Sequence, residues 1–174
     1  YEYELQHMLH LKAARVAEAT DSRILQKRAH ELAARRNARA YQRLAAAFGT
    51  PGEGCPEFDE GEEILYLMGL SAGLQAALHD KASGGMVGVD MGIPVQVIRA
   101  TECLDTNVYW GLPGAIRGAI YASIPATAPQ GFDPWQLLEE SAAIGDAGGV
   151  RMARALYIRV ASSAGKSEKN PELI

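Results

Sequence analysis

The chain has 174 residues, of which 48% are hydrophobic and 22% charged, and its formal net charge is −4. These totals are typical of one folded domain and exclude a disordered chain. The negative net charge argues against nucleic acid as the main partner, and no run of about 18 apolar residues predicts a membrane span. The sequence begins with Tyr1 rather than Met, which fits a fragment or a mature form that has lost a signal peptide.

The first 48 residues predict a helical hairpin. One helix is expected over residues 1–19, where Leu5, Leu9 and Val16 recur along one side. A second helix is expected from Ser22 to Phe48, a stretch built from strong helix formers. This second helix is basic, because it carries Arg23, Lys27, Arg28, Arg35, Arg36, Arg39 and Arg43.

A glycine- and proline-rich segment, residues 49–54, ends the basic helix and separates it from a helical-repeat domain expected over residues 59–164. The acidic residues around this break are Glu53, Glu57, Asp59, Glu60, Glu62 and Glu63. The pattern has two interpretations. Either the acidic segment and the basic helix compensate each other on the surface, with carboxylates also favoured at a helix N-terminus, or the arginine face receives an anionic partner or a lipid surface.

Stripes of small residues mark two helices of this domain. The helix expected over residues 60–81 is apolar nearly all round, which predicts a central position in a helical layer, and it carries Gly69 and Gly73 on one stripe. The helix expected over residues 111–124 carries a second stripe, formed by Gly111, Gly114, Gly118 and Ala122. Because glycine inside a helix costs about 1 kcal/mol relative to alanine, we expect these helices to pack through their stripes. Close packing alone and a small-molecule channel beside the glycines are both consistent with this pattern.

The other expected elements complete an all-α fold. Pro94 opens a short helix, and Asp59 and Asp133 are expected to be the N-caps of the helices that follow them. A last helix covers residues 150–164, and the polar tail, residues 165–174, is expected to fray. Seven helices and no strand predict stacked helical hairpins, a tetratricopeptide-like array.

Cys55 and Cys103 are the two cysteines of the chain, and neither has a partner at metal-binding spacing. A disulfide in an oxidising compartment and two free thiols both remain consistent with this pattern.

Two patterns resemble functional motifs but are incomplete. Glu4 and His7 have the spacing of a di-iron helix, but no second Glu-x-x-His occurs, and the four histidines are expected at exposed or capping positions. The segment Gly165-Lys166-Ser167 resembles the end of a phosphate-binding loop, but Val160 stands where that loop requires glycine. The sequence therefore predicts no metal, no cofactor and no catalytic residue.

Segments in the second half of the chain resemble a known family. They are Leu104-Asp105 with Asn107, Tyr109-Trp110-Gly111, Gly118-Ala119-Ile120-Tyr121-Ala122-Ser123-Ile124-Pro125, Gly131-Phe132-Asp133 and Leu156-Tyr157. In this order they resemble the tetratricopeptide-like periplasmic component associated with tripartite ATP-independent periplasmic (TRAP) transporters, the TatT-like family, over about residues 60–164. Two features depart from the family pattern. The arginine-rich helix has no clear counterpart, and Gly131-Phe132 replaces a glycine pair.

The resemblance implies a non-enzymatic periplasmic protein that self-associates as a trimer and docks on the transporter's solute-binding protein. It also implies an apolar channel for a small ligand. The candidate ligand-binding residues are Tyr66, Gly69, Gly73, Tyr109, Trp110, Gly114, Arg117 and Tyr121. Arg117 would suit a carboxylate ligand, because its planar guanidinium can bind one with two hydrogen bonds, although a surface ion pair is the more common role for an arginine.

Two other hypotheses remain at this stage. The chain could be a cytosolic helical-repeat adaptor that binds a partner's peptide, or, on weaker grounds, a metal-dependent helical enzyme. A signal sequence or lipobox upstream of Tyr1 would favour the transporter hypothesis, and the absence of stoichiometric iron or zinc would exclude the enzyme.

Overall fold

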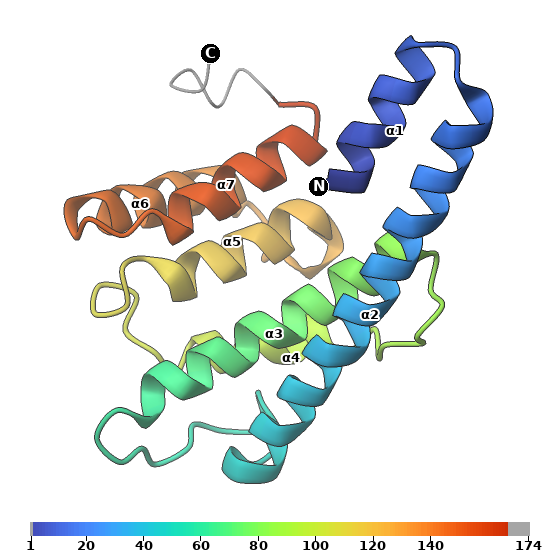
Figure 1. The fold of residues 1–174 in the computed structure, drawn as a ribbon. Coiled ribbons are helices and arrows are strands. Elements are labelled where there is room, and N and C mark those ends of the chain that lie inside the picture. Colours follow the sequence, from blue (N-terminus) through green and yellow to red (C-terminus); the bar gives the residue numbers. More distant parts are fainter. Residues whose placement is uncertain (1, 167–174) are drawn as a thin grey trace.

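The structure, a computed structural model, describes residues 2–166, which form seven α-helices, one short 3₁₀ helix and no strand (Figure 1). The elements are α1 (Glu2–Lys12), α2 (Val16–Phe48), α3 (Glu62–Ser83), α4 (Ile93–Thr101), α5 (Leu112–Ser123), η1 (Pro125–Thr127), α6 (Pro134–Ala147) and α7 (Met152–Ser163). The prediction of an all-α fold with seven helices is confirmed. Most of the tail expected to fray, residues 167–174, lies outside the described residues.

The first helix break lies earlier than predicted. The chain turns at residues 13–15, where Ala14 has a left-handed backbone with φ of 55°, and α2 then runs through the polar residues 20–22 without interruption. Two local features explain why these residues stay helical. The Thr20 hydroxyl donates to the Val16 carbonyl oxygen one turn earlier, and Ser22 is buried on the inner face of α2.

The N-cap predicted for α6 is confirmed, whereas the N-cap predicted for α3 is wrong. Asp133 is the N-cap of α6, as expected, and its carboxylate accepts a hydrogen bond from the Trp135 backbone N–H at 2.8 Å. Asp59 is not the N-cap of α3, which is Gly61 in a left-handed conformation with φ of 83°. The Glu62 carboxylate instead accepts the Asp59 backbone N–H, which is one half of a capping box.

Two clusters of buried side chains hold the helices together. The larger cluster joins the C-terminal half of α2 to α3, α4 and α5, and its largest fully buried members are Tyr66, Leu67, Leu70, Val97, Ile116 and Ile120. The smaller cluster joins α5, α6 and α7 around Leu138 and Tyr157. Because α2 shares the larger cluster, the packing does not separate the hairpin of residues 1–48 from the rest of the chain.

The prediction that α3 and α5 pack through their small-residue stripes is wrong. Gly69 faces α2, where a Cβ added to the glycine would lie 2.8 Å from the Leu44 Cβ. Gly118 faces α6, where an added Cβ would lie 2.9 Å from the Leu138 Cγ. Each stripe therefore contacts a different neighbouring helix. A glycine stripe indicates a close approach but does not identify the helix that approaches.

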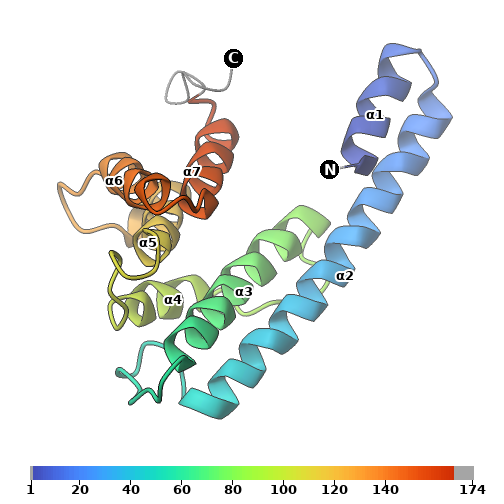
Figure 2. The ribbon, with the colours of Figure 1, turned by 60° about the vertical axis from the view of Figure 1, so that its left-hand side comes forward.

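The helices form a body and a projecting arm. In Figure 2, α1 and the N-terminal part of α2 extend away from the body that contains α3 to α7. α1 runs back along α2, and the C-terminal half of α2 lies along α3 (Figures 1 and 2). We call α1 together with residues 16–32 of α2 the arm.

Candidate functional site

Of the predicted ligand-binding aromatic residues, Tyr66 and Tyr121 belong to the larger buried cluster and Tyr109 packs against it, but their rings have different neighbours. Tyr66 is 1% exposed, and its ring packs against those of Phe48 and Phe58. Tyr121 is also buried, with its ring edge-to-face against Phe132. Burial raises the pKa of both phenols, so they remain neutral hydrogen-bonding groups at physiological pH.

The remaining predicted residues do not complete a shared cavity with these tyrosines. The Tyr109 hydroxyl donates to the Glu63 carboxylate, which raises the pKa of the phenol, and Trp110 has a left-handed backbone with φ of 51°. Gly114 is in contact with Ser141 of α6, and Gly73 with Tyr41 of α2. These contacts fill the space beside the two glycines.

Gly69 and Arg117 have different surroundings. Gly69 borders a groove of about 530 Å³ between α2 and α3, together with Leu65 and Met68. Arg117 is half-buried and forms no ion pair within residues 2–166. Ligand binding at the eight predicted residues stays a prediction: the three tyrosines share the larger buried cluster, whereas Gly69 borders a groove and Gly114 contacts α6.

A cleft of about 550 Å³ lies between the C-terminal halves of α3, α5 and α7. Its lining residues are Leu74, Leu78, Lys81, Ala82, Ala119, Ala122, Ser123, Leu156, Arg159, Val160, Ser163 and Ala164. The walls are mainly apolar, two cationic side chains and two hydroxyls are the polar groups, and the lining contains no carboxylate. None of the eight predicted ligand-binding residues borders this cleft. Its lining comes from three helices that are far apart in the sequence, so no local motif could have indicated it.

Two histidines form a pair beside α7. His30 of α2 and His79 of α3 are half-buried, and their Nδ1 atoms lie 2.9 Å apart, so one ring donates a hydrogen bond to the other. Burial lowers the pKa of both imidazoles, and the Arg159 guanidinium lowers both further. The expectation that all histidines are exposed or cap a helix is therefore wrong for this pair. It packs α2 against α3.

The arm has its polar side inward and its apolar side outward. The residues of α1 that are partly buried, and therefore face α2, are Tyr3, Gln6, His7 and His10. His7 donates from Nδ1 to the Ala19 carbonyl oxygen at 2.7 Å, which fixes this orientation. The exposed apolar residues of the arm are Leu5, Met8, Leu9, Leu11, Val16, Ile24, Leu25 and Leu32. Exposure of this many large apolar side chains on one hairpin is unusual for a surface that only contacts water.

The basic and acidic segments are not joined by ion pairs. Within residues 2–166 the ion pairs are Arg35–Glu31, inside α2, and Arg154–Asp146, between α7 and α6. The other basic residues of α2 form no direct ion pair with the acidic residues 53–63. Apart from the Arg35–Glu31 pair, direct ion pairs within residues 2–166 therefore do not compensate the positive side of α2.

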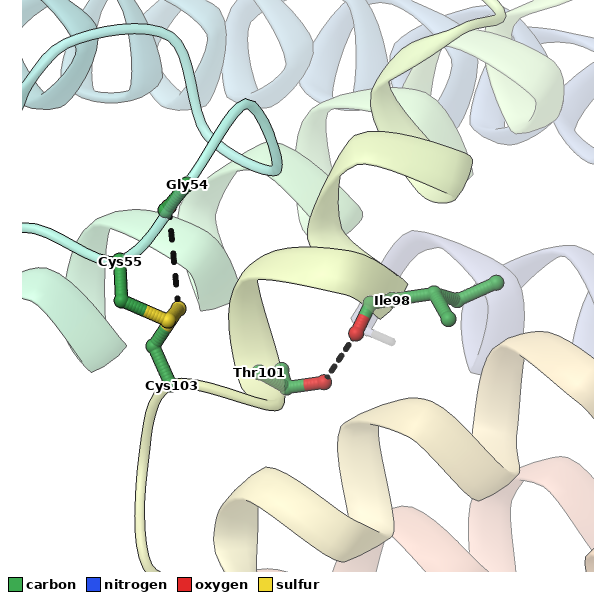
Figure 3. Close-up of a disulfide and its surroundings, with 5 residues drawn as sticks. All are labelled: Gly54, Cys55, Ile98, Thr101 and Cys103. Carbon is green, nitrogen blue, oxygen red and sulfur yellow. Dashed lines mark hydrogen bonds between the residues drawn. A yellow bond between two sulfur atoms is a disulfide. The ribbon is translucent and has the colours of Figure 1, made fainter.

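A disulfide joins Cys55 to Cys103, with the two Cα atoms 5.3 Å apart (Figure 3). It attaches the loop between α2 and α3 to the turn that follows α4 (Figure 3). Of the two states left open by the sequence, the structure contains the disulfide.

The described part of the chain has neither a metal-binding cluster nor a membrane-spanning helix. No group of three or more histidine, cysteine or carboxylate side chains within residues 2–166 is arranged to hold a metal ion. Each helix in this range is too short or too polar to cross a bilayer. Comparison of the chain with protein-family models, with curated proteins and with solved structures finds no match.

Proposed function

We propose that this chain is a non-enzymatic periplasmic helical-repeat protein that self-associates and docks on the solute-binding protein of a TRAP-type transporter. It would also hold a small apolar or carboxylate ligand. The family resemblance over residues 60–164 motivates the transporter partner. The observation that carries self-association is the outward apolar face of the arm.

The arm is difficult to explain in an isolated chain. Leu5 and Leu9 are 51% and 52% exposed, although each would contribute about 1.5–3 kcal/mol if fully buried. The opposite face of α1 places the less apolar His7 and Gln6 against α2. A helix oriented in this way gains most of its apolar burial only when another surface covers its outer face.

Charge favours a second copy of the chain as the surface that covers the outer face of the arm. The arm carries Arg23, Lys27 and Arg28, whereas the loop before α3 carries Glu53, Glu57, Asp59 and Glu60, and these groups form no ion pairs within residues 2–166. Arg23, Lys27 and Arg28 of one copy are complementary to the acidic loop of the next, although the arm also carries Glu2, Glu4, Glu18, Asp21 and Glu31. Contacts between two different patches of this kind form a ring, such as a trimer, when the rotation between copies closes.

The disulfide favours the periplasmic proposal over the cytosolic adaptor. Disulfides persist in oxidising compartments, which include the bacterial periplasm, and are rare in the cytosol. The link between Cys55 and Cys103 therefore supports a location outside the cytosol.

Native mass spectrometry tests self-association. We expect the wild-type chain to be a trimer and the Leu5→Glu/Leu9→Glu variant to be a monomer with an unchanged helical circular dichroism spectrum. Val108→Glu is the matched control, because Val108 is also exposed but lies outside the arm, and this variant should remain trimeric. A monomeric wild-type chain, or a trimeric arm variant, would contradict the proposed interface.

Calorimetric titration of this chain with a solute-binding protein tests docking. The probe is the solute-binding protein of any TRAP transporter whose genes lie beside the gene for this chain. Saturable binding supports the proposal, and the absence of heat at micromolar concentrations of both proteins contradicts it.

A further inference from the structure

We infer that the cleft between α3, α5 and α7 binds an amphipathic carboxylate, with its hydrocarbon chain along the apolar walls and its anionic head between Lys81 and Arg159. This inference rests on the small-ligand part of the proposed function and deepens it by naming the site and the ligand class.

The size and walls of the cleft suit a hydrocarbon chain. A volume of about 550 Å³ lies within the range of small-molecule sites, roughly 300–1,000 Å³. Leu74 and Leu78 of α3 and Leu156 and Val160 of α7 all line the cleft. The α5 wall consists of small residues, including Ala119, which leaves the space between the larger side chains open.

The cationic side chains of the cleft favour an anionic head group on the ligand. Lys81 belongs to α3 and Arg159 to α7, so the two cations approach the cleft from different walls. Neither forms an ion pair within residues 2–166, and the cleft lining contains no carboxylate. A bound carboxylate would therefore meet two cations and no like charge, and the guanidinium can donate two hydrogen bonds to it.

The neighbouring histidines agree with this reasoning. Burial lowers the pKa of both His30 and His79, and the positive charge of Arg159, which lines the cleft, lowers both further. The hydroxyl of Ser163 is engaged with the Arg159 carbonyl oxygen at 2.9 Å, whereas Ser123 on α5 is left as a further donor. The polar groups at the cleft are thus mainly donors and cations, which suit an anion.

Titration of the purified chain with decanoate and with decanol tests the inference, because the two probes share a hydrocarbon chain and differ in charge. We expect decanoate to bind about tenfold or more tightly than decanol, because charge-assisted hydrogen bonds contribute about 1.5–3 kcal/mol. Arg159→Gln and Lys81→Gln should each reduce this preference, and Ala122→Trp should weaken binding of both probes by filling the cleft. Arg99→Gln is the matched control, because Arg99 is exposed on α4 and does not line the cleft.

Several outcomes would overturn the inference. These are equal affinity for decanol and decanoate, no binding of either probe at millimolar concentration, or an equal loss of affinity in the Arg99→Gln control. The measurement needs neither the transporter partner nor the trimer. Failure of decanoate binding with docking intact would therefore refute the cleft assignment alone, whereas decanoate binding without docking would refute the transporter role alone.

Discussion

Removal of the Cys55–Cys103 disulfide should destabilise the fold substantially. The two cysteines are separated by 48 positions in the sequence, and the bond restricts the unfolded chain by closing this loop. For a loop of this length, the chain-entropy model gives about 4 kcal/mol at 25 °C. In a domain of this size 1 kcal/mol corresponds to roughly 2–4 °C, so the expected loss in melting temperature is roughly 8–16 °C.

Calorimetric unfolding of the wild-type chain and of the Cys55→Ser/Cys103→Ser variant measures the loss. Reductant should lower the melting temperature of the wild-type chain toward that of the variant, and it should leave the variant unchanged. Equal melting temperatures for the oxidised chain and the variant would refute the reasoning, because the bond would then contribute nothing to the stability of the fold.

Three further changes test the packing and the buried polar groups. Gly118→Leu should destabilise the fold by about 1–3 kcal/mol in urea unfolding, because the new side chain would collide with Leu138 of α6, and an unchanged midpoint would place the glycine beside open space. Asp80 is 5% exposed, and burial opposes its charge, but hydrogen bonds from the backbone after α3 outweigh this effect and lower its pKa. The ionised carboxylate therefore stabilises the fold, and this stabilisation should be lost as pH falls below about 3.8. Asp80→Asn should cost about 1.5–3 kcal/mol at pH 7 in the same assay, and a neutral result would show that those hydrogen bonds are dispensable. The pKa values of His30 and His79 are lowered from 6.5 by burial, so the fold favours their neutral forms and should lose stability as pH falls below 6.5. Urea unfolding should give a lower free energy of unfolding at pH 5.5 than at pH 7.5 for the wild-type chain, and a smaller difference after substitution of both histidines by glutamine. Equal differences would mean that the pair does not titrate in this range.

Local sequence signals predicted the helices well and their limits less well. Asp133 and Pro134 began α6 as predicted, because an N-cap side chain and a proline act within one turn. The break expected at residues 20–22 moved to residues 13–15, because Thr20 and Ser22 found hydrogen-bonding or buried positions inside α2. Polar residues suited to a cap thus also suit a helix interior when their hydroxyls have local partners.

The sequence by itself determined the number of helices, their approximate limits and the presence of close helix contacts, since periodicity, proline and glycine act over short distances along the chain. The tertiary structure decided which helices meet. It directed the stripe of Gly69 toward α2 and that of Gly118 toward α6, paired Cys55 with Cys103, and brought Lys81 and Arg159 to one cleft. These contacts depend on how side chains from distant segments pack together, and a local sequence pattern does not predict that packing.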